Sequence, residues 1–170
     1  MQEPPRRERS ERLTVTLYAI RPDPKTGALD DDAEVITQSK YGWQFLEQAV
    51  MLWRLVDNSR AGKIDAIIER ATHAAGDGEL RFYRPDLEEL VQLLTGVDDA
   101  IVAAGIVGQH WRVPADRLED LAKQVPAMDL TTERSLDDKT HALAEIMINA
   151  VSIRNFLSNA LDAGCVVVLA

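Results

Sequence analysis

The feature that most constrains the fold is a long apolar stripe in the last third of the chain. Hydrophobic residues at heptad spacing share one helical face between Ser135 and Gly164. The stripe consists of Leu136, Leu143, Ile146, Ala150, Ile153, Leu157 and Ala160. Ser135 is a favourable N-cap, and Gly164 can take the left-handed conformation that ends a helix. At roughly 1.5 Å per residue the helix is about 40 Å long, which predicts a spine on which other helices pack.

Two β-prone runs lie near the two ends of the chain. Leu13–Ile20 alternates apolar and polar residues, which predicts a half-buried strand. Cys165–Ala170 is unbroken and β-branched, which predicts a strand covered on both faces. We expect the two strands to pair and so to bring the two ends of the chain together.

The chain between these runs is mostly helical by its periodicity. A helix is expected to begin at Asp86 as N-cap, with Glu89 at the capping-box position. The apolar stretch Val97–Val107 predicts a helix buried on most sides, which another helix approaches closely at the small residues 103–105. Further helices are expected over Trp43–Asn58, Ala61–Ala75 and Pro114–Val125, and a short strand over Ala33–Gln38. Glu79–Arg84 is either a short strand or only an extended crossing before Pro85. The predicted fold is mainly α, a helical bundle around a long C-terminal helix, with a small β-sheet formed near the chain ends (α+β).

Domain organisation follows from composition. Residues 1–12 hold two prolines and seven charges, which is typical of a disordered tail. Residues 13–170 are long enough for a single globular domain with its own core.

Composition also excludes some classes of protein. The single cysteine, Cys165, excludes an internal disulfide framework and a multi-cysteine zinc site. No apolar run reaches the roughly 18 residues needed to cross a bilayer, and the first residues lack the apolar core of a signal peptide. We therefore expect a cytoplasmic protein. The net charge of −9 argues against nucleic acid as a direct ligand.

The negative charge is concentrated. Between Asp86 and Leu130 there are nine acidic residues against Arg112, Arg117 and Lys123. Such a segment can simply keep the protein soluble, or it can attract a basic protein partner. On the second interpretation the candidate partner-binding residues are Glu88, Asp98, Asp99, Asp116, Glu119 and Asp120, together with His110 and Trp111 of the loop that follows Val107.

Candidate chemistry is sparse. The sequence has no phosphate-binding loop, dinucleotide glycine pattern, nucleophile elbow or zinc-protease helix. His141 lies among Asp137, Glu145 and Asn149 at four-residue spacing, and Glu69 and His73 are also four apart. Two such helices could hold a metal ion, but surface pairs are the favoured explanation, so no metal or other cofactor is expected.

The acidic run Asp30–Glu34 lacks the glycine and the ligand spacing of a calcium loop and indicates a solvated loop. Cys165, after a helix C-terminus and before an apolar strand, is expected to be buried and inert.

These observations favour a soluble acidic binding protein. Its sharpest form is an immunity or antitoxin-type inhibitor of the bacterial kind, which masks a protein partner by direct binding. One alternative is an enzyme with a polar site near His110 or His141. Another is a self-associating helical subunit, and a homodimer remains open. No membrane partner is expected.

Overall fold

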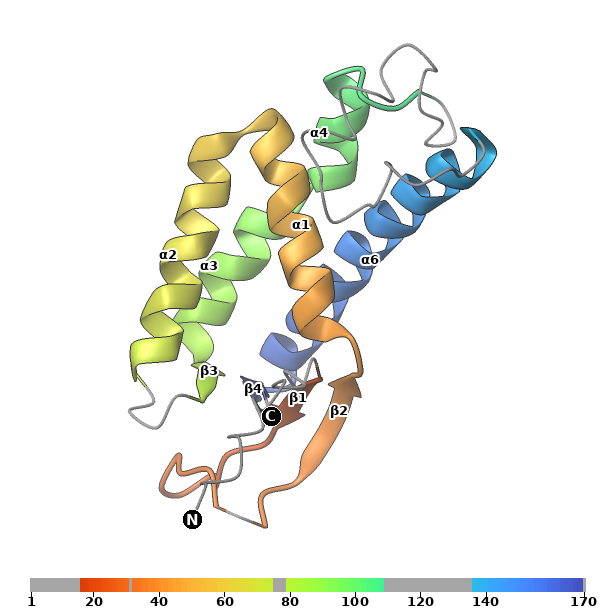
Figure 1. Ribbon diagram of the computed structural model, residues 1–170. Coiled ribbons are helices and arrows are strands. Elements are labelled where there is room, and N and C mark those ends of the chain that lie inside the picture. Colours follow the sequence, from red (N-terminus) through yellow and green to blue (C-terminus); the bar gives the residue numbers. More distant parts are fainter. Residues whose placement is uncertain (1–15, 31, 75–78, 109–135, 170) are drawn as a thin grey trace, which may run out of the picture.

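The computed structural model describes residues 16–30, 32–74, 79–108 and 136–169. These residues form a layer of helices with a four-stranded antiparallel sheet at one end (Figure 1). The elements in chain order are β1 (Leu17–Ile20), β2 (Val35–Ser39), α1 (Gly42–Val56), α2 (Asn58–Ala74), β3 (Leu80–Phe82), α3 (Arg84–Leu94), α4 (Val97–Ala103), α6 (Leu136–Asp162) and β4 (Val166–Leu169).

Helix α6 is the predicted spine. It packs against α1, α3 and α4, and Figure 1 shows it running along the whole helical layer. The described part of the apolar stripe is buried, from Leu143 to Ala160. The helix ends as predicted, because Gly164 has a φ of 69° and the Cys165 N–H bonds back to the Ala160 carbonyl at 2.9 Å. The long-helix prediction is confirmed.

The sheet has the strand order β2-β1-β4-β3. Strands β1 and β4 are antiparallel neighbours, with Leu17 opposite Leu169, so the predicted pairing of the two end strands is confirmed. One face of the sheet joins the helices in a single core through Leu17, Ala19, Leu80, Phe82 and Val167. Val166 and Val168, on the other face of β4, are also buried, as expected for a strand covered on both sides. The mixed α+β fold predicted from the sequence is therefore the fold observed.

Strand β2 and helix α1 meet at a tight corner. Gly42, the first residue of α1, lies against the side chain of Leu17, and a Cβ at this position would come within 2.9 Å of a Leu17 methyl carbon. Only glycine allows this approach of the helix to the sheet.

Two predicted helices differ from the structure. Helix α3 begins at Arg84 with Tyr83 as its N-cap, so Asp86 lies inside the first turn and is not the cap. The physical reason is Pro85, whose fixed φ suits the first helical turn. Helix α4 ends at Ala103 instead of continuing to Val107. Gly105 takes a φ of 71° there, and the Ile106 N–H bonds to the Ile101 carbonyl at 3.3 Å, which closes the helix.

The small residues after α4 also differ from expectation. Residues 103–105 are exposed, so no described helix approaches them closely, and Val102 is exposed as well. The predicted helix Pro114–Val125 and the tail 1–12 lie outside the described residues.

Candidate functional site

Three of the eight predicted partner-binding residues fall in the described part of the chain. Glu88 lies on α3, and Asp98 and Asp99 lie in the first turn of α4. The other five, His110, Trp111, Asp116, Glu119 and Asp120, lie outside the described residues, as does the side chain of His141.

The carboxylates of α3 are paired with arginines. Arg70 of α2 contacts Asp86 at 2.6 Å and Glu89 at 3.4 Å, and Arg84 contacts Glu88 at 2.9 Å. The hydrogen bond that Arg70 donates to the Asp86 carboxylate is the main reason that the pKa of Arg70 is raised above its ordinary value. Much of the negative charge predicted for this part of the surface is therefore balanced within the fold.

Asp98 and Asp99 have a different environment. They follow Gly96, which has a φ of 84°, and no arginine or lysine of the described chain pairs with them. Asp99 is exposed and Asp98 is half-buried. Carboxylates in the first turn of a helix also interact favourably with its N-terminal partial charge, so these two residues have a structural role besides any role in binding.

A second acidic surface lies in the loop between β1 and β2. The loop forms a shallow pocket of about 560 Å³. Among the residues that the structure describes, its charged lining residues are Arg21, Asp23, Asp30, Asp32 and Glu34. Arg21 pairs with Glu34 at 3.0 Å, which leaves three carboxylates in excess. We call this surface the hairpin pocket.

The loop around the hairpin pocket is held by its own hydrogen bonds. The Asp23 carboxylate accepts the backbone N–H groups of Lys25 at 2.7 Å and Thr26 at 3.0 Å. These two bonds lower the pKa of Asp23 below its ordinary value of 3.8. Gly27, with a φ of 69°, donates its N–H to the Asp23 carbonyl at 2.8 Å. Asp23 is thus presented on a turn of defined shape.

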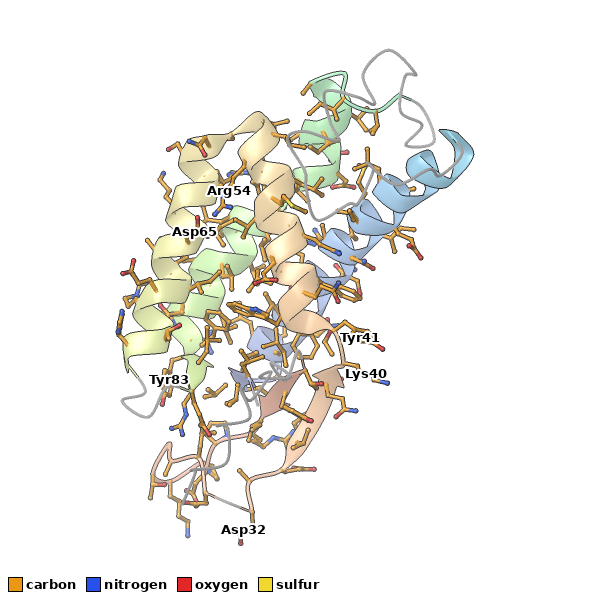
Figure 2. The ribbon with its side chains drawn as sticks, viewed as in Figure 1. Asp32, Lys40, Tyr41, Arg54, Asp65 and Tyr83 are labelled. Atoms are coloured by element: carbon orange, nitrogen blue, oxygen red, sulfur yellow. The ribbon has the colours of Figure 1, made fainter. Side chains whose placement is uncertain are left out.

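Strand β2 continues from the hairpin pocket along the margin of the sheet. It pairs with β1 on one side only, and no described strand lies on the other. Its sequence, VITQS, is uncharged, and Val35 is 50% exposed. Lys40 and Tyr41 follow the strand, with the Lys40 Nζ 5.5 Å from the centre of the Tyr41 ring. Figure 2 shows Asp32 beyond one end of β2 and Lys40 and Tyr41 at the other. We call the outer side of β2 the open edge.

The other candidate residues, the Glu69–His73 pair and Cys165, do not form a reactive or metal-binding site in the described chain. In the ranges that the structure describes, no group of three or more metal-ligating residues is found. Glu69 and His73 approach to 4.0 Å with both side chains strongly exposed, which is the arrangement of a surface pair. Cys165 is buried, and burial raises the pKa of its thiol above the ordinary value, so the thiol is a poor nucleophile at neutral pH. Among the described helices, none has the length and apolar character to span a bilayer.

Comparison of the chain with protein-family models, with curated proteins and with solved structures found no match. The hairpin pocket and the open edge were not among the residues that the sequence singled out for binding. The available signal was the position of the acidic run Asp30–Glu34 directly before the uncharged run Val35–Ser39.

Proposed function

We propose that this protein acts by binding a protein partner directly, through a surface that attracts positive charge. The observation that supports the proposal is the hairpin pocket, which has four carboxylates and one arginine in its lining. A concave surface of one sign of charge raises the local concentration of an oppositely charged partner and the rate of encounter. We therefore expect a partner with a basic surface.

The sharpest form of the proposal is an inhibitor of the immunity or antitoxin type. Such a protein covers its partner's active site, so it needs complementary shape and charge and no reacting group of its own. In this form, the hairpin pocket receives a lysine or arginine side chain from the rim of that active site. The predicted residues Glu88, Asp98 and Asp99 form the competing surface, and of these only Glu88 has an arginine partner within the described chain.

The test compares two variants with the same total charge. Asp30→Asn with Asp32→Asn removes two negative charges from the hairpin pocket, and Asp98→Asn with Asp99→Asn removes two from α4. The partner is captured from the protein's own host with the full tagged chain, and its association and dissociation rates are measured at low and high salt. Thermal melts of both variants verify that they remain folded.

We expect the hairpin variant to associate about three to ten times more slowly at low salt, with a smaller difference at high salt because salt screens the attraction. The α4 variant should stay within about twofold of the unmodified protein. An acidic partner, or equal rates in all three proteins, would contradict the proposal. Turnover of a small molecule by the purified protein would favour the enzyme alternative.

A further inference from the structure

We infer that the partner contributes an extended segment, which adds to the sheet as a fifth strand beside β2 and carries lysine or arginine where it passes the hairpin pocket. The inference rests on the proposed function and specifies the mode of binding and the chemistry of the bound segment. Two features of the described chain support it: the open edge, and the charges at its two ends.

The open edge offers backbone hydrogen bonds. In an antiparallel pair, every second residue bonds to the neighbouring strand, and the alternate residues turn their N–H and C=O groups the other way. Within the described residues β2 pairs only with β1, so its alternate residues present these groups to the open edge. An extended segment can satisfy them, which is the general mode of strand addition in peptide recognition.

The sequence of β2 does little to prevent such an addition. Exposed edges in native sheets are commonly protected by charged residues, proline, bulges or a very short strand. None of the residues Val35–Ser39 is charged or a proline. A register shift next to Ile20 disturbs the Val35 end, whereas residues 37–39 pair with β1 in regular register. A regular, uncharged stretch therefore remains available.

The charges at the two ends of β2, together with antiparallel pairing, indicate where the added segment carries its basic residues. Asp30, Asp32 and Glu34 precede β2, and Lys40 follows it, so the edge is negative at one end and positive at the other. Every neighbouring pair in this sheet is antiparallel, and we expect the added strand to continue that pattern. Its C-terminal end then passes the hairpin pocket. The bound segment should have an uncharged, β-prone stretch followed by lysine or arginine.

The same argument selects a basic segment over a second copy of this chain. A second copy would bring another net charge of −9 to the contact. A basic segment instead reduces the net charge of the complex and places its cations at the three excess carboxylates of the hairpin pocket.

The experiment uses a displayed library of random decapeptides, selected on the full-length protein. The consensus peptide is then synthesised in three forms: unmodified, and with backbone N-methyl groups on one or the other set of alternate residues. Dissociation constants are measured by titration, and backbone amide shifts identify the residues in contact. Binding is also measured with the hairpin-pocket and α4 variants described above, which each remove two negative charges and so separate the effect of position from that of total charge.

We expect the selected peptides to carry lysine or arginine on the C-terminal side of an uncharged stretch, and to shift the amides of β2. One N-methylated form should lose at least about tenfold in affinity and the other at most about threefold, because only one set of N–H groups faces β2. Asp30→Asn with Asp32→Asn should weaken binding about fivefold, and Asp98→Asn with Asp99→Asn less than twofold.

No enrichment of peptides, equal losses for both N-methylated forms, or shifts confined to residues outside β2 would overturn the inference. Sedimentation that shows a dimer, with peptides excluded from it, would identify a second copy as the occupant and would also overturn it. The proposed function is judged separately by the charge dependence of association with the captured partner. A charge-sensitive partner together with no peptide binding would reject the added strand and leave the proposed function standing.

Discussion

The two edges of the sheet are built in opposite ways. Strand β3 has three residues with Arg81 at its centre, and both α2 and α3 pack against it. Its apolar side chains, Leu80 and Phe82, are buried. Strand β2 has five residues without a charge, and Val35 is half exposed to solvent.

The two edge strands differ in how well they are protected against pairing with another chain. Strand β3 combines a short length with a central charge, two devices that prevent pairing with another chain. Of the devices that protect an edge strand, the described part of the chain gives β2 only the register shift near Val35. Burial explains why β4 is uncharged, but it does not explain β2, for which the proposed addition of a partner strand would provide a reason.

The largest expected effect compares a buried side chain of β3 with an exposed side chain of β2. Phe82 is fully buried, so Phe82→Ala should lower the free energy of unfolding by about 3–5 kcal/mol through lost burial and a residual cavity. Val35→Ala, on the other edge, should change it by less than about 0.5 kcal/mol. Urea unfolding followed by circular dichroism measures both. Similar losses at the two positions would show that the edges are equally structural.

A second change gives β2 the protection that β3 has. Gln38→Lys places a cation in the open edge, as Arg81 does in β3, and should change the free energy of unfolding by no more than about 0.5 kcal/mol. The affinity for the selected peptide should fall at least about fivefold. Gln44→Lys, on an exposed position of α1, adds the same charge elsewhere and serves as the control. Equal effects of the two lysines would mean that total charge, and not the edge, determines binding.

The smallest effect concerns the turn that shapes the hairpin pocket. The pKa of Asp23 lies below its ordinary value of 3.8 because the carboxylate accepts two backbone N–H groups. Because the pKa of Asp23 is lower in the folded state, its ionised carboxylate stabilises the turn fully at pH values above its ordinary pKa. This stabilisation is lost as the pH falls through the lowered pKa. The amide shifts of Lys25 and Thr26 should therefore titrate with a midpoint below 3.8. Asp23→Asn should remove that titration, and a midpoint at or above the ordinary value would contradict the bonded turn.

The parts of the fold that the sequence predicts are those determined by long periodic patterns. The stripe along α6 and the β-branched runs at the two ends specify burial over many residues, so local preferences agree with the packing. The misplaced boundaries of α3 and α4 have local causes. At Pro85 and Gly105 the conformation of one residue determines where the helix begins or ends. An apolar pattern does not show which residue sets the boundary.

The candidate site was harder to predict for an electrostatic reason. Counting charges along the chain gave the acidic segment after Asp86, but Arg70 on α2 pairs with Asp86 and Glu89 across two helices. A sequence gives the number of charges in a segment and not their partners, so it overestimates the field where distant arginines pack nearby. Among the described residues that line the hairpin pocket only Arg21 is basic, so their charges sum to an excess of negative charge.

The register of β1 and β4 also has a mechanical consequence. Leu17, where the chain enters β1, lies opposite Leu169, where it leaves β4, so both connections depart from the same end of the sheet. Hydrogen bonds between antiparallel strands run perpendicular to the strands. A force that pulls these two ends apart therefore loads the bonds one pair at a time, beginning at Leu17 and Leu169. The strands peel instead of shearing, and an unfolding machine that pulls at these ends meets little resistance, although β4 is buried on both faces.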